Sequence, residues 1–140
     1  MKVLIDTNIV IDILEQREPF FEASYRVMQL GLEGQFEAYI SASAVTDVYY
    51  IINQSLRDSV KAREKIFALT TLMAIYSTTP DDIRNALAIF VNDFEDAVMA
   101  ATAKREKTDY IITRNSSDFA NSPIPAISPS DFLSKYEPVR

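Results

Sequence analysis

Residues 3–8 read Val-Leu-Ile-Asp-Thr-Asn, and this short stretch decides the fold class. The apolar run from Val3 to Ile5 favours a strand that is buried on both faces. Strands of this kind belong to parallel sheets, because helices cover both sides of such sheets. Asp6 follows the strand directly and therefore lies at the carboxyl edge of the sheet, where open α/β folds bind their ligands. The stretch predicts an architecture and the place of a site within it.

The same alternation continues along the chain, with short apolar runs separated by longer helical patterns. Further strands are expected at residues 36–40, 73–76, 110–113 and 125–127, with helices between them. Thr7 or Asn8 is the expected N-cap of the first helix. The chain has only two glycines, which disfavours an all-β fold rich in tight turns. We predict one α/β domain over residues 1–140, a three-layer α/β/α fold around a parallel sheet of four to five strands.

The composition excludes several kinds of chemistry. The 140 residues include no His and no Cys, and 20 Asp plus Glu outnumber 14 Lys plus Arg for a net charge of −6. Without Cys there is no disulfide, thiolate nucleophile or zinc ribbon, and without His there is no Ser-His-Asp triad. The acidic balance argues against binding nucleic acid through a basic surface alone. Hard cations such as Mg²⁺ and Mn²⁺ stay possible, since they prefer oxygen ligands.

The sequence carries no sign of secretion or of a membrane span. The apolar stretch near the N-terminus is interrupted by Asp6 and again by Asp12. A signal peptide needs an apolar region of ~7–15 residues, and a spanning helix needs ~20. We therefore expect a cytoplasmic protein that is not attached to a membrane.

Four acidic residues from distant parts of the chain are predicted to meet at the edge of the sheet where Asp6 lies. Asp47 is near the start of the helix that follows the second strand, and Asp96 is in the first turn of an Ala-rich helix. Asp118 lies in the loop after the strand at residues 110–113. Carboxylates gathered in this way repel one another and raise each other's pKa unless a cation shields them. The acids are predicted to bind one or two Mg²⁺ or Mn²⁺ ions, which can activate water and stabilise charge on a phosphate.

Each of these acids also has a purely structural interpretation. Asp6 can cap a turn or a helix, and Asp118 can cap a turn. Asp47 and Asp96 can favour a helix macrodipole, and Asp93 can be the N-cap of the Ala-rich helix. Their joint placement on one edge shifts the balance toward a site. The other acids in helical stretches are expected on solvated faces: Asp12, Glu15, Asp58 and Glu64.

Taken together, the motifs resemble those of the PIN domain family. The resemblance covers essentially the whole chain, and the length suits a stand-alone protein of the VapC toxin type. The motifs that carry it, in chain order, are Asp6-Thr7-Asn8, Asp47, Phe94-Glu95-Asp96-Ala97, Thr113-Arg114-Asn115-Ser116-Ser117-Asp118-Phe119 and Pro123-Ile124-Pro125-Ala126-Ile127-Ser128-Pro129.

The resemblance implies an endoribonuclease that depends on Mg²⁺ or Mn²⁺ and hydrolyses RNA with metal-activated water. Asp6, Asp96 and Asp118 match the first, third and fourth acids of the family motif and are the implied metal ligands. The second acid is more often Glu in this family, and here it is Asp47. Because the Asp side chain is one methylene shorter, it reaches less far toward an ion. Asp47 is therefore expected to take part through water.

The resemblance also implies supporting residues and partners. Asn8, Thr113 and Asn115 correspond to polar neighbours of the acids, and Asp93 shares a helix face with the third acid. Family members of this size commonly act as toxins paired with a small antitoxin, and they commonly form homodimers. Arg114, beside the acidic rim, is the expected contact for an RNA phosphate. Two other basic stretches, 57–65 and 104–107, are more typical of solvated helix faces.

Two competing hypotheses come from other classes of protein. One is a PIN-like module that binds nucleic acid or protein and has lost its catalytic site, as Asp47 and the acidic surface suggest. The other is a phosphoryl-transfer domain with a strand-end Asp. A phosphatase of the haloacid dehalogenase type requires an Asp two residues after Asp6, where Asn8 stands. A receiver domain requires a Lys where Arg114 and Asn115 stand, so this second alternative ranks low.

Overall fold

The computed structural model describes residues 1–137 and is organised around a five-stranded parallel sheet. The strand order is β3-β2-β1-β4-β5, which places the N-terminal strand at the centre. The strands are β1 (Lys2–Ile5), β2 (Glu37–Ser41), β3 (Ala74–Tyr76), β4 (Tyr110–Ile112) and β5 (Ala126–Ile127). Each lies within one or two residues of its expected place, so the predicted α/β class and parallel sheet are confirmed.

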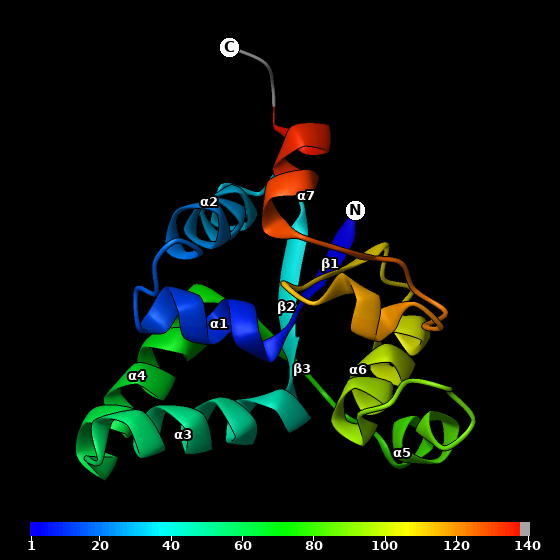
Figure 1. The fold of residues 1–140 in the computed structure, drawn as a ribbon, viewed down its shortest axis with the longest axis horizontal. Helices are drawn as coiled ribbons and strands as arrows, with labels where there is room; N and C mark the ends of the chain where they lie inside the picture. Colours follow the sequence, from blue (N-terminus) through cyan, green and yellow to red (C-terminus); the bar gives the residue numbers. More distant parts are fainter. Residues whose placement is uncertain (138–140) are drawn as a thin grey trace.

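Helices cover both faces of this sheet and complete three layers (Figure 1). Helices α1 to α4 lie on one side, and α5 and α6 lie on the other. Over residues 1–137, no helix has the combined length and apolar character that crossing a bilayer requires. The helices are α1 (Thr7–Leu14), α2 (Phe21–Leu32), α3 (Ala42–Leu56), α4 (Ser59–Leu72), α5 (Pro80–Ala86), α6 (Phe94–Arg105), the 3-10 helix η1 (Ser116–Phe119) and α7 (Pro129–Tyr136).

The central strand is buried as the sequence predicts. Val3, Leu4 and Ile5 are at most 1% exposed, because α-helices cover β1 from both sides. The neighbouring strands β2 and β4 contribute side chains that are equally buried, and together they form one contiguous core. Burial of apolar side chains in this layer supplies most of the driving force for folding.

The register of β1 and β4 fixes the position of two polar residues at the carboxyl edge. Ile5 is opposite Ile112, so the residues that follow them, Asp6 and Thr113, leave the sheet side by side. The backbone N–H of Asp6 donates to the carbonyl of Ile112 at 3.0 Å, and that of Thr113 donates to Ile127 at 3.0 Å. Main-chain hydrogen bonds therefore hold both residues rigidly at this edge.

The N-caps of the helices differ in one place from the expected ones. Asp6, rather than Thr7 or Asn8, caps α1, and its Oδ1 accepts a hydrogen bond from the Thr7 N–H at 2.7 Å. The reason is that Asp6 keeps the extended backbone of the strand, so the helix begins immediately after it. Asp93 caps α6 as predicted, and Asp58 caps α4.

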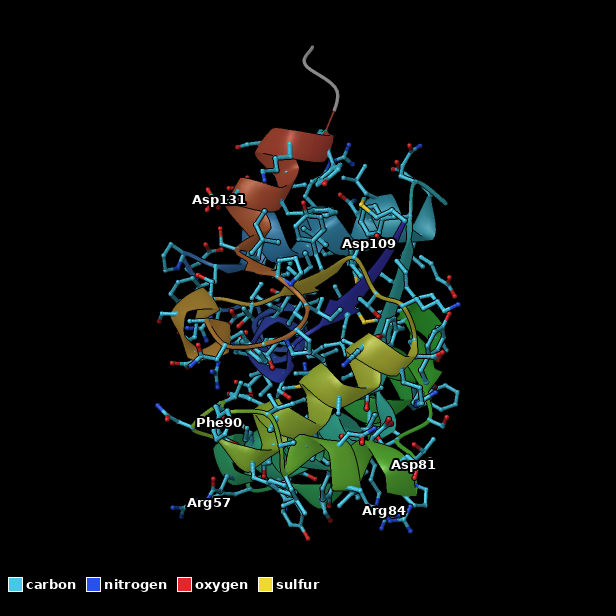
Figure 2. The ribbon with its side chains drawn as sticks, turned by 90° about the vertical axis from the view of Figure 1, so that its right-hand side faces the viewer. Arg57, Asp81, Arg84, Phe90, Asp109 and Asp131 are labelled. Atoms are coloured by element: carbon cyan, nitrogen blue, oxygen red, sulfur yellow. The ribbon has the colours of Figure 1, made fainter. Side chains whose placement is uncertain are left out.

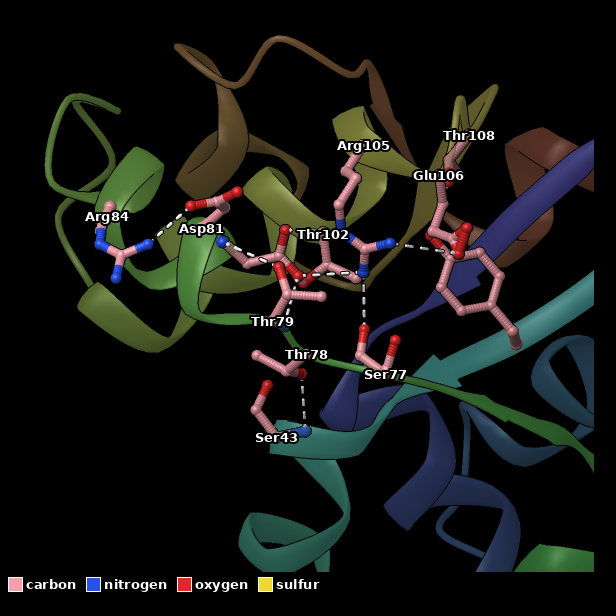
Figure 3. A network of polar contacts seen from close by, with 12 residues as sticks. Ser43, Ser77, Thr78, Thr79, Asp81, Arg84, Thr102, Arg105, Glu106 and Thr108 are labelled. Atoms are coloured by element: carbon pink, nitrogen blue, oxygen red, sulfur yellow. Dashed lines mark hydrogen bonds and ion pairs between the residues drawn. The ribbon is translucent and has the colours of Figure 1, made fainter.

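A buried charge ties α5 to α6 (Figure 3). Asp82 is 0% exposed and accepts hydrogen bonds from the Nε of Arg105 at 2.8 Å and from the Thr102 hydroxyl at 2.9 Å. Arg105 also donates to the Ser77 carbonyl at 2.7 Å, so this residue lies on an exposed face as expected and is in addition paired with a buried acid. Burial acts to raise the pKa of Asp82, but these hydrogen bonds and one from the Thr79 backbone hold it below its ordinary value.

We expect Asp82→Ala to lower the free energy of unfolding at pH 7 by on the order of 2–4 kcal/mol, because it leaves Arg105 and Thr102 without their buried partner. The control is Asp81→Ala, since Asp81 pairs with Arg84 at the surface (Figure 2) and its side chain is 76% exposed. Its loss is expected to cost at most about 0.5 kcal/mol. Urea unfolding curves measure both free energies of unfolding. Equal losses in the two variants would contradict the stabilising role of the buried Asp82.

Candidate active site

A hollow of about 320 Å³ lies at the carboxyl edge of the sheet, and acidic side chains dominate its lining. They come from the end of β1, from α3, from the start of α6 and from η1. All four acids predicted to converge are among them. The acidic residues of the lining are Asp6, Asp47, Asp93, Glu95, Asp96 and Asp118.

Asp6 is the most deeply buried acid of the hollow, with 5% of its surface exposed. Its Oδ2 accepts a hydrogen bond from the Thr113 hydroxyl at 2.7 Å, while its Oδ1 caps α1. Burial raises the pKa of Asp6; the two hydrogen bonds oppose this effect, and the charges of Asp118 and Asp93 add to it. Asp6 therefore caps a helix and also faces the other acids, so the two interpretations of this residue are compatible.

Thr113 is the centre of a small polar network that orients Asp6. It is fully buried, and its Oγ1 accepts hydrogen bonds from the Asn8 Nδ2 at 3.4 Å and from the Asn115 N–H at 3.1 Å. The Oδ1 of Asn8 in turn accepts the Arg114 N–H at 3.4 Å. Asn8 and Asn115 both line the hollow. Asn8, Thr113 and Asn115 therefore form hydrogen bonds that link them to one another and, through Thr113, to Asp6.

The first turn of α6 brings three acids to the hollow. Asp93 caps the helix by accepting the Glu95 N–H at 2.8 Å. Burial raises the pKa of Asp96 to about 7, and the charges of Asp6, Asp93 and Asp118 contribute to the shift. A carboxylate placed only to favour the helix macrodipole would gain from ionisation, and its pKa would fall. The raised pKa of Asp96 is instead typical of a site where negative charges are crowded.

Asp47 contacts the hollow through a partner that the sequence interpretation left without a role. It is half-buried on α3, and its carboxyl group lies close enough to that of Glu95 for each to affect the pKa of the other. Burial raises the pKa of both residues, and the charge of Asp47 adds to the rise at Glu95. The sequence did contain a signal that Glu95 lines the hollow, because Glu95 directly precedes Asp96 in the first turn of α6.

The two arginines near the hollow have different surroundings. Arg17 lines the hollow and donates to Glu15 at 3.0 Å. Arg114 instead donates to both carboxylate oxygens of Asp12, at 2.6 and 3.3 Å. The phosphate contact predicted for Arg114 stays a prediction, and in this structure its guanidinium is paired with Asp12. The solvated faces expected for Asp12 and Glu15 are wrong, because Asp12 is 0% and the Glu15 side chain 12% exposed.

The donor chemistry of the hollow fits a hard divalent cation. Every acidic ligand offers oxygen, and burial together with neighbouring negative charge raises the pKa of Asp6 and Asp96, a cost that a bound cation would relieve. Within residues 1–137, no three acidic side chains stand close enough to form a ready-made ligand set. Mg²⁺ does not need one, since it usually keeps several waters and binds through one or two carboxylates. Asp6, Asp96 and Asp118 fit such a water-rich site.

The fold is a parallel α/β fold with an acidic hollow at the carboxyl edge of its central strand. These features define a class of proteins whose site is built from carboxylates, in contrast to sites built from histidine or cysteine side chains. Comparison with known families is consistent with this class. Residues 2–117 match the PIN domain. The chain belongs to the PIN domain family, as the sequence motifs around Asp6 and Asp96 predicted.

Individual relatives extend this similarity over nearly the whole chain. Ribonuclease VapC1 of Aquifex aeolicus is 23% identical over 140 residues, covering 96% of this chain and 95% of that protein. The solved structure of VapBC2 from Rickettsia felis, bound to a promoter DNA fragment, aligns with a TM-score of 0.75 and 15% identity over 91% of this chain and 98% of its own. A toxin–antitoxin complex from Klebsiella pneumoniae aligns with a TM-score of 0.64 and 24% identity over 91% and 97%. The structural likenesses show that the fold is shared.

The raised pKa of Asp96 makes the metal-free protein sensitive to pH. Because the folded protein binds this proton more tightly than the unfolded chain does, its contribution to stability is complete below pH ~4 and is lost as the pH rises through about 7. Asp96→Asn removes the crowded charge and should stabilise the metal-free protein at pH 8 by roughly 1–3 kcal/mol, with no gain at pH 4. Urea unfolding in EDTA at both pH values measures the difference. Asp131→Asn, on α7 outside the hollow, is the control, and an equal gain from it would contradict the explanation.

Proposed function

We propose that this protein is an endoribonuclease that requires Mg²⁺ or Mn²⁺. The observation that carries the proposal is the hollow lined by carboxylates from the end of β1 and from α3, α6 and η1. Among the described residues, Asp6, Asp96 and Asp118 form no ion pair with a basic side chain. Membership of the PIN domain family supports it, and so does the relative in Aquifex aeolicus that is named a ribonuclease.

The roles of the acids follow from their surroundings. Asp6, Asp96 and Asp118 would hold one or two ions, and a bound ion lowers the pKa of water and stabilises charge on a phosphate. Thr113 fixes the carboxylate of Asp6 through its hydroxyl, so this ligand is oriented in advance. Asp47 supports the site from α3, where its carboxyl group interacts with that of Glu95 on α6.

Arg17 is the proposed contact for an RNA phosphate. Of the described residues that line the hollow, it alone is basic, and its side chain is 40% exposed. The guanidinium groups of Arg17 and Arg114 are both paired with a carboxylate, but the Arg114 side chain is only 26% exposed and does not line the hollow, so it is less suited to this role. A guanidinium can bind a phosphate through two hydrogen bonds, which would orient the substrate beside the acids.

The test is RNA cleavage by the purified protein with Mn²⁺ or Mg²⁺. EDTA should abolish cleavage, and Asp6→Asn and Asp96→Asn should each lower the rate at least ~100-fold, because each removes a charge that would hold the ion. Both variants should keep the circular dichroism spectrum of the parent. Asp58→Asn serves as the control, since Asp58 caps α4 and lies outside the lining of the hollow.

Normal cleavage by both site variants would contradict the proposal. Calorimetric titration with Mn²⁺ then distinguishes the nuclease from the alternative, a PIN-like module that binds nucleic acid or protein without cutting it. An absence of carboxylate-dependent Mn²⁺ binding would favour that module. Mn²⁺ binding that Asp96→Asn weakens would favour the nuclease.

We also propose that the protein is the toxin of a toxin–antitoxin pair and docks a small antitoxin in an apolar groove. The groove, of about 740 Å³, lies between α2 and α4, and its lining includes Tyr25, Leu32 and Leu56, which are all at least 36% exposed. Exposed apolar grooves of this kind mark protein interaction sites. The toxin–antitoxin complex from Klebsiella pneumoniae shares this fold, which supports an antitoxin as the occupant.

We expect Ala68→Arg to abolish a complex with the small protein encoded in the adjacent reading frame, because Ala68 is half-buried in the groove lining and a long charged side chain fills that space. The control is Ser59→Arg, which adds the same charge at an exposed position on the same helix. Co-expression followed by light scattering measures the complex and also tests the homodimer that the family resemblance implies. A complex that tolerates Ala68→Arg would place the antitoxin elsewhere.

A further inference from the structure

A second buried charge pair involves residues next in sequence to two that line the hollow, Ile11 and Asn115. Asp12, in the last turns of α1, is 0% exposed, and the Arg114 guanidinium meets both of its carboxylate oxygens, Nε at 2.6 Å and Nη2 at 3.3 Å. The ring of Phe20 covers the guanidinium, with its centroid 4.2 Å from the Arg114 Cζ. Burial raises the pKa of Asp12, and Arg114 supplies the largest opposing effect. The two hydrogen bonds from Arg114 offset much of the cost of burying this carboxylate.

The place of Arg114 in the chain connects this pair to the candidate site. Arg114 stands between Thr113, whose hydroxyl binds Asp6, and Asn115, which lines the hollow. The carbonyl of Asn115 accepts the Asp118 N–H at 2.9 Å at the start of η1. The side chain of one residue therefore anchors the segment that presents both Asn115 and Asp118.

The segment needs an anchor because little else holds it. Residues 115–118 are exposed, and the next buried side chain is Phe119, which is 3% exposed. The charge of Asp118 contributes to the raised pKa of both Asp6 and Asp96, so like charges lie together around the hollow. At one end the segment is held by the side chain of Arg114 and by the Asn115 N–H, which donates to the Thr113 hydroxyl at 3.1 Å, and at the other end by the buried side chain of Phe119.

We propose that Asp12 and Arg114 are positioning residues that hold the segment from Asn115 to Asp118 at the hollow, so that Asp118 faces Asp6 and Asp96. The positioning of metal ligands in this proposal rests on the proposed function, while the anchoring of the segment stands on the contacts alone. The planar fork of Arg fits both oxygens of Asp12, and a Lys at the same position keeps the charge but loses this geometry. The pair thus fixes the site without touching substrate or ion.

The experiment compares Arg114→Lys with Arg105→Lys. Arg105 also forks onto an Asp that is 0% exposed, Asp82, but it lies at the far end of α6 from Asp96. Arg114→Lys should speed hydrogen exchange of the Asp118 amide at least ~10-fold in the metal-free protein, weaken Mn²⁺ binding ~10–100-fold and lower kcat with little change in KM. Arg105→Lys should lower the unfolding midpoint comparably and leave all three values within about twofold, since it is remote from the segment.

The outcomes separate this inference from the proposed function. Unchanged exchange at Asp118 in Arg114→Lys, or equal effects from the two Lys variants, would overturn the positioning role and leave a purely stabilising pair. If the parent protein cuts no RNA, the proposed function fails, but faster exchange at Asp118 in Arg114→Lys alone still supports the anchor. Asp12→Asn provides a second arm, because it keeps the shape of the side chain and should reproduce the effects of Arg114→Lys.

Discussion

Repulsion among carboxylates at the carboxyl edge of β1 is the constraint on which the rest of this structure depends. Burial raises the pKa of Asp6 and Asp96, and neighbouring carboxylates, Asp118 among them, raise it further, so the folded chain keeps charges together that would separate if they were free. The fold resists this with rigid attachments. Asp6 is held by the sheet ladder, by the N–H of Thr7 and by the Thr113 hydroxyl. The arrangement costs stability, which is common where a site is prepared for a ligand.

Two Asp–Arg pairs give the protein the rigidity that this crowding requires. Asp82 and Arg105 tie α5 to α6 on one side of the sheet, and Asp12 and Arg114 tie α1 to the segment after β4 on the other. In each pair the Asp is fully buried, and the Arg reaches it from the surface. Removing one partner leaves a buried polar group unsatisfied, which is why such pairs act as fixed points. Neither pair belongs to the lining of the hollow, yet both support elements that carry its acids.

The sequence predicted the sheet and the acidic edge because both depend on local order. An apolar run followed at once by Asp6 gives a buried strand and a residue at its carboxyl end, whatever the rest of the chain does. The partner of Arg114 was missed because that contact spans 102 residues of sequence. A signal for the burial of Asp12 was nevertheless present. Helix α1 reads Thr-Asn-Ile-Val-Ile-Asp-Ile-Leu, and a helix that is apolar on nearly every side is buried, so its single acid must find a cation.

The net charge of −6 acquires a specific meaning from the position of these residues. If the protein acts on RNA as proposed, a phosphate that approaches the hollow meets six acidic side chains and one guanidinium, that of Arg17, so the bare site would repel it. One or two divalent cations would cancel ~2–4 of these charges at the point where the phosphate must arrive. A site of this kind therefore makes substrate binding depend on the same ion as the chemistry does. Binding of RNA should consequently fail together with cleavage when the ion is removed, because both need the carboxylate charge to be neutralised first.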